Sequence, residues 1–180
     1  MSIDLVIAWA LRLGLALLFV AAAWHKLSDR PRFEAAIRAY ELLPMRGATS
    51  ASWLLPACEG AIALALLVPA WQRHAAGAAV ALLLLYTAAI AINLARGRRR
   101  IDCGCFPSRS ATPISGALVA RNGGLIAAAC LLLLPVRTRP LLWIDALTLI
   151  TTLVTLSLLW GATQRLVRTG PALRGLGGLR

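Results

Sequence analysis

Cys103 and Cys105, separated only by Gly104, are the residues of this 180-residue chain whose types and spacing most directly predict chemistry. A disulfide between them would close a small, strained ring that is easily reduced, and glycine lowers the steric cost of its sharp turn. Arg100 favours the thiolate, the nucleophilic form of cysteine, whereas Asp102 acts weakly in the opposite direction. The segment therefore predicts a redox-active pair, Cys103 and Cys105, tuned by Arg100 and Asp102.

Two other interpretations of this pair stay open. The cysteines are either ordinary loop thiols that stay reduced, or half of a metal site. Zinc normally takes four ligands with wider cysteine spacing, and no second Cys or His pair is close in the sequence. We therefore expect no metal.

The composition indicates that the cysteine segment belongs to a membrane protein. The chain is 59% hydrophobic and only 14% charged, with a mean hydropathy of +0.76. A soluble domain needs more polar surface than this, whereas side chains that face lipid are apolar. The net charge of +12 is carried by short arginine clusters between apolar runs, and no basic domain is present. We therefore expect a lipid bilayer, and no nucleic acid, as the partner.

Five apolar runs have about the length that a helix needs to cross a bilayer. They comprise residues 7–27, 51–68, 74–94, 114–134 and 141–160. The expected fold is all-α and polytopic: a four-helix transmembrane bundle plus a fifth, C-terminal span. Because no basic residue precedes the first run, we do not expect a cleaved signal peptide there.

The remaining segments complete this organisation. Residues 31–43 carry apolar side chains at helical spacing and predict a short helix on the membrane surface. The Cys-Gly-Cys loop comprises residues 95–113, and the membrane domain as a whole comprises residues 1–163. Residues 164–180 are basic and contain glycine, which predicts a flexible tail.

The distribution of basic residues predicts the orientation in a bacterial inner membrane. Fourteen Lys and Arg residues fall on the side of the cysteine loop and the C-terminus, and three fall on the other side. Loops that face the cytoplasm carry the excess of Lys and Arg. We therefore expect the N-terminus outside, and the C-terminus and the cysteine loop in the cytoplasm.

Several polar residues lie inside the apolar runs, where an unpaired charge is unfavourable. Glu59 and Arg121 are expected to pair across the bundle, with Asn122 adding a hydrogen bond. Whether this pair is structural or functional stays open. Cys58, next to Glu59, is either a small buried residue or a relay thiol.

His25 and Lys26 close the first apolar run. At this position their polar tips are expected to reach the lipid headgroups at the membrane interface. A lone histidine there is more typical of an interface residue than of a metal or haem ligand, and the sequence shows no facing histidine pair that predicts a b-type cytochrome.

Several short elements follow one another in a characteristic order. They are His25-Lys26-Leu27, the segment from Phe33 to Pro44, the segment from Pro56 to Glu59, Ile101-Asp102-Cys103-Gly104-Cys105-Phe106 and Ala120-Arg121-Asn122. In these elements, over roughly Leu5 to Leu134, the sequence resembles the methylamine utilisation family MauE, which is related to the DoxX-like four-helix membrane proteins.

The resemblance implies a role in the maturation of a periplasmic enzyme, the methylamine dehydrogenase, whose small subunit is rich in disulfides. It also implies a thioredoxin-like partner and makes Cys103 and Cys105 the exchanging thiols. The leading hypothesis is therefore a membrane thiol–disulfide oxidoreductase. The alternatives are a non-catalytic assembly or transport factor, and a quinone-linked oxidoreductase subunit like other DoxX-like proteins, with a quinone as cofactor.

The predicted orientation and the periplasmic client place the cysteines and the substrate on opposite sides. Three explanations stay open. The loop reaches through the bundle; or it takes electrons from a cytoplasmic donor and passes them to a quinone or to Cys58; or the orientation is inverted.

Overall fold

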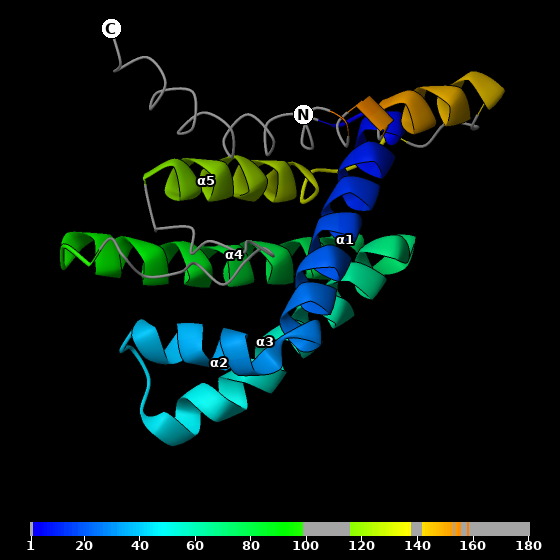
Figure 1. Ribbon diagram of the computed structural model, residues 1–180. Coiled ribbons are helices and arrows are strands. Elements are labelled where there is room, and N and C mark those ends of the chain that lie inside the picture. Colours follow the sequence, from blue (N-terminus) through cyan, green and yellow to red (C-terminus); the bar gives the residue numbers. More distant parts are fainter. Residues whose placement is uncertain (1, 99–115, 138–141, 153, 156–157, 159–180) are drawn as a thin grey trace, which may run out of the picture.

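A computed structural model describes residues 2–98, 116–137, 142–152, 154–155 and 158 (Figure 1). Cys103, Cys105, Asp102, Arg100 and the tail 164–180 lie outside the described residues. The named elements are α1 (Leu5–Ser28), α2 (Arg30–Ala39), α3 (Met45–Leu67), the short 3-10 helix η1 (Pro69–Trp71), α4 (Gln72–Ala95) and α5 (Gly116–Leu131). Residues 143–152 form a further helix.

The all-α membrane fold expected from the sequence is confirmed. In the described part of the chain, three helical segments are long and apolar enough to cross a bilayer: Leu5–Ser28, Met45–Leu67 and Pro69–Ala95. The chain is therefore a multi-pass membrane protein. Helix α5 is apolar but has only 16 residues, fewer than the roughly 20 that a perpendicular span needs, so the count of five spans stays a prediction.

Local sequence explains where the first two helices begin and end. Asp4 caps α1, since its side chain accepts a hydrogen bond from the Val6 N–H at 2.8 Å. Asp29 ends α1 and caps α2, and Pro31 occupies the first turn of α2, where its missing N–H does no harm. Helix α2 ends at Ala39, before the expected residue 43, because Glu41 adopts a left-handed backbone with φ +49°.

Helix α3 begins at Met45, six residues before the second apolar run. Its first turns contain Arg46, Thr49 and Ser50, which are exposed and polar. An apolar run marks only the part of a helix that lies in hydrocarbon, so these turns extend α3 beyond it.

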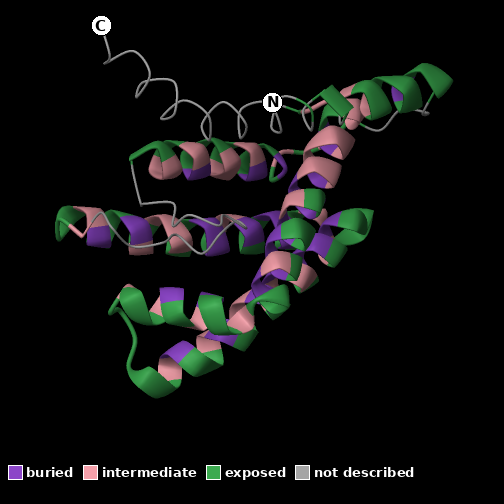
Figure 2. Ribbon diagram, in the orientation of Figure 1, coloured by how far each residue is buried: buried purple, intermediate pink, exposed green. Residues whose placement is uncertain are grey.

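The four long helices pack in pairs (Figure 1). Helix α1 crosses α3, and α4 lies alongside α5, while α2 packs against the first half of α3. Lipid is as apolar as leucine, so helices in a membrane associate through close packing rather than through hydrophobic burial. Purple marks the buried positions of the helices in Figure 2. Many buried positions accordingly hold small side chains, namely Ala8, Ala16, Ala63, Ala75, Ala76, Ala79 and Ala129.

Hydrogen bonds join the start of the chain to the segment after α5. Ile3 forms a parallel bridge with Val136. The Ile3 N–H donates to the Pro135 carbonyl at 3.0 Å, and the Arg137 N–H donates to the Ile3 carbonyl at 3.0 Å. The N-terminus of α1 therefore lies beside the C-terminus of α5.

The connection that carries Cys103 and Cys105 leaves and re-enters the bundle at the same end as α2. Ile90 of α4 packs there with Tyr40 after α2 and with Leu118 at the start of α5. Arg98, the last described residue before the connection, donates to Glu41 at 2.5 Å. We call this end of the molecule the α2 end.

Candidate functional site

A buried ion pair lies at the α2 end of the bundle. Lys26, in the last turn of α1, pairs through Nζ with Oε1 of Glu59 in the middle of α3. Their side chains are only 3% and 1% exposed. Each charge alone would be strongly destabilising at this depth, so the two residues act as a unit.

Tyr86 of α4 completes this cluster, which we call the Lys26–Glu59–Tyr86 triad. Its Oη donates to Glu59 Oε1 at 2.9 Å and accepts from Lys26 Nζ at 3.1 Å. The lysine nitrogen also lies 4.5 Å from the centroid of the Tyr86 ring, a favourable cation–π distance. Glu59 Oε2 has no hydrogen-bond partner among the described residues, so the carboxylate keeps one oxygen that can accept a proton or a water hydrogen bond.

A small cavity of about 40 Å³ adjoins the triad. Arg121 and Asn122 of α5 line it together with the triad, so all four long helices contribute to its wall. A volume of this size is enough for an ordered water, which needs roughly 10–15 Å³ and two or more polar partners. The site can therefore hold a water inside the bundle.

The ion-pair partner of Glu59 differs from the one expected. The sequence predicted Arg121, whereas the structure places the amine of Lys26 against the carboxylate. Arg121 instead lines the same cavity and donates through Nη2 to Oδ1 of Asn122 at 3.4 Å. Arg121 and Asn122 thus line the same small cavity as Glu59, but the ion pair with Glu59 is made by Lys26 of α1.

Lys26 also departs from its expected place among the lipid headgroups. Its side chain points into the bundle because the Glu59 carboxylate lies within reach of the last turn of α1. Pairing with Glu59 offsets part of the penalty of burying the Lys26 charge, and the hydrogen bond and ring of Tyr86 offset a further part. Its neighbour His25 is half-exposed.

The remaining expected residues take no part in the triad. Cys58 is a half-buried free thiol packed against the apolar core, and Cys130 is free and exposed. Cys103, Cys105, Asp102 and Arg100 lie outside the described residues. In the part of the chain that the structure describes, no group of three or more His, Cys, Asp or Glu side chains is placed to hold a metal ion.

Sequence reasoning missed Tyr86. It lies in a run of alanine and leucine and is one of only two tyrosines in the chain. A phenol inside an apolar span needs a hydrogen-bond partner, and this was the available signal.

An apolar cavity of about 310 Å³ lies on the other side of the triad, between α2 and α4. Its walls include Phe33, Ile37 and Ile90, and Lys26 and Tyr86 also line it. Lys26 and Tyr86 thus line both the small cavity, which also contacts Glu59, Arg121 and Asn122, and the larger apolar cavity.

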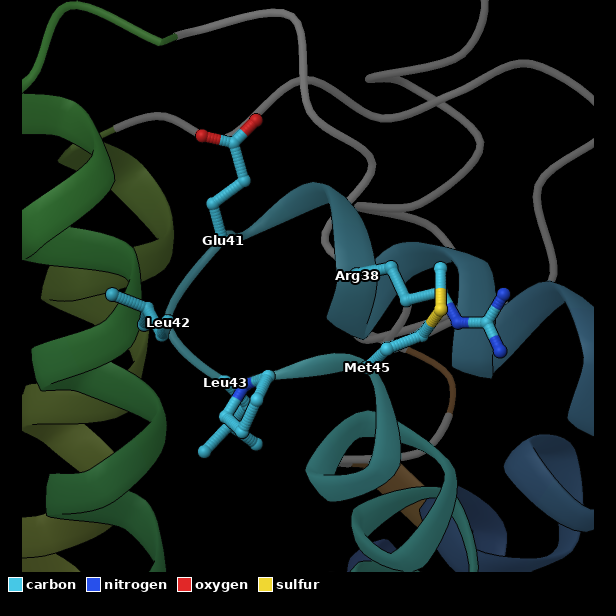
Figure 3. A pocket seen from close by; sticks show the side chains of 6 residues that line it. Arg38, Glu41, Leu42, Leu43 and Met45 are labelled. Carbon is cyan, nitrogen blue, oxygen red and sulfur yellow. The ribbon is translucent and has the colours of Figure 1, made fainter.

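A third cavity, of about 470 Å³, lies at the turn between α2 and α3 (Figure 3). Arg38, Glu41, Leu43 and Met45 line it, and in Figure 3 Glu41 points away from Leu43. The pairing of Arg98 with Glu41 ties this turn to the end of α4, directly before the cysteine segment.

Comparison with known proteins identifies the family. The family described as methylamine utilisation protein MauE matches residues 5–135. The chain belongs to the MauE family. Methylamine utilization protein MauE of Paracoccus denitrificans is 46% identical over 127 residues, which cover 71% of this chain and 68% of that protein. The protein of the same name in Paracoccus versutus is 41% identical over 123 residues, or 68% of this chain and 66% of the relative.

A third MauE, from Methylorubrum extorquens, is 38% identical over 124 residues, which cover 69% of this chain and 67% of the relative. The similarity thus spans about two thirds of the length of these MauE proteins. No solved structure matches the chain. The MauE match includes the triad, Arg121, Asn122 and the cysteine segment, and it stops where the Ile3–Val136 bridge closes the bundle.

Proposed function

We propose that this protein supports the maturation of a periplasmic enzyme of methylamine utilisation by thiol–disulfide exchange at Cys103 and Cys105. The observation that carries the proposal is the Cys103-Gly104-Cys105 sequence within the region that matches the MauE family. The client, by resemblance, is the disulfide-rich small subunit of methylamine dehydrogenase, and a thioredoxin-like protein is the exchange partner.

The exchange proceeds in two balanced steps. A thiolate of the pair attacks a disulfide of the partner, which forms a mixed disulfide and releases one partner thiolate. The second cysteine then attacks the mixed disulfide, so the partner leaves as a dithiol and Cys103 and Cys105 are joined. The reverse sequence transfers the disulfide to the partner. Arg100 favours the thiolate that starts either direction, and Asp102 moderates it.

The described structure supports this proposal through the two ends of the cysteine segment. Arg98, paired with Glu41, and Leu118, packed with Ile90, hold these ends at the α2 end of the bundle. A partner that docks at the α2 end would therefore meet the chain next to both ends of the cysteine segment.

The test replaces cysteines in a strain that depends on this protein for growth on methylamine. We expect Cys103→Ser, Cys105→Ser and the double variant each to abolish disulfide formation in the dehydrogenase small subunit, followed by gel mobility after thiol alkylation. Cys130→Ser is the matched control, because Cys130 is a free, exposed thiol elsewhere in the chain. If the double variant still matures the enzyme at the normal rate, the protein acts as a non-catalytic assembly or transport factor.

The apolar cavity beside the triad favours a second candidate, a quinone-linked oxidoreductase. The residues present fit a lipid-soluble quinone: the apolar walls suit its isoprenoid tail, and the third N–H of Lys26, which the triad does not use, can donate to a quinone carbonyl oxygen. A quinone would supply the two-electron acceptor that reoxidation of a dithiol requires. Organic extraction of the purified protein distinguishes this candidate, because it predicts a quinone bound in a stoichiometric amount that falls in Lys26→Met.

We further propose a place in the bacterial inner membrane with the N-terminus outside. In this orientation the cysteine pair serves the periplasmic client either by reaching through the bundle or by passing electrons to a quinone or to Cys58. The excess of Lys and Arg on the connections at the α2 end supports this orientation. The Ile3–Val136 bridge would then lie on the periplasmic side.

A further inference from the structure

Arg12 is a buried cation for which the described residues supply no carboxylate. It lies in α1 about 10 Å along the helix axis from Leu5, and its side chain is only 2% exposed. Its Nε donates to the Leu66 carbonyl at 2.7 Å, and its guanidinium stacks 4.1 Å from the centroid of the Trp9 ring. Nη2 is buried without a hydrogen-bond partner among the described residues.

These contacts leave the charge of Arg12 uncompensated. A carbonyl dipole and an aromatic face each offset part of the penalty of burial, but neither replaces a counter-ion. The ion pairs of the described residues all involve other cations. The buried guanidinium of Arg12, with its unused N–H, can therefore pair with and donate a hydrogen bond to an anion from outside the protein.

A cavity of about 570 Å³ adjoins Arg12 at the end of the bundle opposite α2. Its lining includes Arg73 and His74 from the first turn of α4, and no Asp or Glu is among the described residues that line it. Asp4, the nearest acid in the sequence, caps α1 and is not part of this lining. The cavity thus gathers one buried and one exposed guanidinium with an imidazole, and its field favours an anion.

The walls of the cavity define the anion further. Leu5, Trp9 and Val136 make much of the surface apolar, and the volume greatly exceeds that of a bare oxyanion. The exposed indole of Trp71, in η1 next to this cavity, is typical of the level of lipid headgroups. A phosphate group held by the arginines, with carbon substituents against the apolar wall, matches both parts of the surface.

We propose that this cavity binds a phosphate group through Arg12 and Arg73, with His74 at its rim. The shared chemistry is a phosphate oxyanion, which either a phospholipid headgroup or a free phosphate compound supplies. The site is separate from the triad, which lies at the α2 end.

The test uses the full chain, purified in a neutral maltoside detergent and freed of lipid. Thermal unfolding is followed with inorganic phosphate against chloride at equal ionic strength, and with phosphatidylglycerol against diacylglycerol, which lacks the phosphate. We expect stabilisation that saturates with a phosphate-bearing ligand and an apparent affinity that falls about tenfold in Arg73→Gln, the loss of one charged contact worth about 1.4 kcal/mol. Arg46→Gln is the matched control, because Arg46 is an exposed arginine in the first turn of α3 at the α2 end.

The two comparisons, inorganic phosphate against chloride and phosphatidylglycerol against diacylglycerol, distinguish the two sources of the phosphate group. Saturable stabilisation by inorganic phosphate assigns the site to a free phosphate compound, whereas stabilisation by phosphatidylglycerol alone assigns it to a lipid headgroup. The proposal is overturned if neither ligand acts beyond its control, or if Arg73→Gln and Arg46→Gln weaken binding equally. Arg12→Lys provides a second variant that keeps the buried charge but removes the bidentate fork, and we expect it to bind more weakly than the wild type.

Discussion

At the scale of single residues, the triad shows why a buried charge must be judged with its partner. Lys26 and Glu59 contribute to the bundle only together, since either charge alone would be left in a medium that cannot solvate it. Tyr86 adds hydrogen bonds that hold both groups in place. Replacing both members is therefore expected to cost less than the sum of the two single replacements.

A double-mutant cycle on Lys26→Met and Glu59→Gln tests this coupling. We expect Lys26→Met alone to destabilise the protein by about 3–5 kcal/mol, because it leaves a buried carboxylate unpaired, and the double variant to lose less than the sum of the singles. The measurement is unfolding in mixed detergent. The exposed pair Arg98–Glu41 is the control, for which Arg98→Met and Glu41→Gln should show coupling below about 1 kcal/mol. Additive effects of the two replacements would contradict the prediction that Lys26 and Glu59 are energetically coupled.

Tyr86→Phe isolates the phenol from the ring. The ring keeps its packing, so the expected loss is that of hydrogen bonds to charged groups, about 1.5–3 kcal/mol. The same unfolding assay measures it. An unchanged stability would mean that the Tyr86 hydroxyl contributes nothing to holding Lys26 and Glu59.

At the scale of elements, α2 is fastened to α3 through Glu34. Thr49 donates to Glu34 Oε1 at 2.8 Å, and Arg38 and Arg30 donate to the carboxylate at 2.5 and 3.1 Å. The Thr49 hydrogen bond, followed by the charges of Arg38 and Arg30, holds the pKa of Glu34 below its ordinary value. The ionised form of Glu34 therefore contributes to the docking of α2 on α3.

The lowered pKa gives this contact a definite pH dependence. Its contribution is fully present above the pKa of an unfolded glutamate, about 4.3, and is lost as the pH falls through the lowered pKa of Glu34. Hydrogen exchange of the α2 amides, corrected for the intrinsic pH effect, should therefore accelerate below that range in the wild type. In Glu34→Gln this acid-dependent component should be absent, and its persistence would show that another group controls the docking.

The turn after α2 depends on the left-handed backbone of Glu41. A residue with a Cβ pays about 1 kcal/mol or more in this conformation, whereas glycine does not. Glu41→Gly and Glu41→Ala both remove the pairing with Arg98, so the comparison between them isolates the backbone. We expect Glu41→Gly to be about 1 kcal/mol more stable than Glu41→Ala in thermal unfolding, and equal stabilities would contradict the left-handed turn.

Sequence patterns carry more information about elements than about contacts. The apolar runs 7–27 and 74–94 lie within α1 and α4, because a bilayer sets the length of an apolar run directly. Helix α3 begins before its apolar run, because polar turns extend the helix beyond hydrocarbon, and the spacing of apolar residues in 31–43 does not reveal the left-handed Glu41. The pairing of Lys26 with Glu59 joins residues 33 positions apart and depends on how α1 crosses α3, which periodicity does not encode.

At the scale of the whole molecule, lipid accounts for a surface that water would not tolerate. Large apolar side chains such as Leu54, Leu64, Leu85 and Ile144 are exposed on the outside of the helices. In a soluble protein a patch of this kind would aggregate or bind a partner. Around a bundle in hydrocarbon it is the expected outer surface.

Thiol labelling in intact cells tests the membrane placement and the orientation together. With a membrane-impermeant maleimide we expect Cys103 and Cys105 to label only after permeabilisation, because the loop is proposed to face the cytoplasm. Cys130 is exposed on α5 but should stay unlabelled in both cases, since lipid covers it. Single-cysteine variants assign the signal to each position.

Two outcomes of this labelling would contradict the proposed orientation or the proposed position of α5 in the bilayer. Labelling of the pair from outside, and only after prior reduction, would mean a periplasmic disulfide and an inverted orientation, and would strengthen thiol exchange. Rapid labelling of Cys130 without permeabilisation would mean that α5 does not lie in the bilayer.

The bridge between Ile3 and Val136 has a consequence for where the chain can be cut without loss of its fold. The helices from α1 to α5 form a loop closed on itself, with its two ends fastened beside each other. Such a unit tolerates circular permutation. A short linker that joins Ile3 to Val136, with new termini opened at the turn near Glu41, would leave the packing of the helices unchanged. The helix at residues 143–152 follows this closed unit in the sequence, and although its Asp145 is buried, its large apolar side chains are exposed, so removing the chain after Arg137 should leave the unit folded.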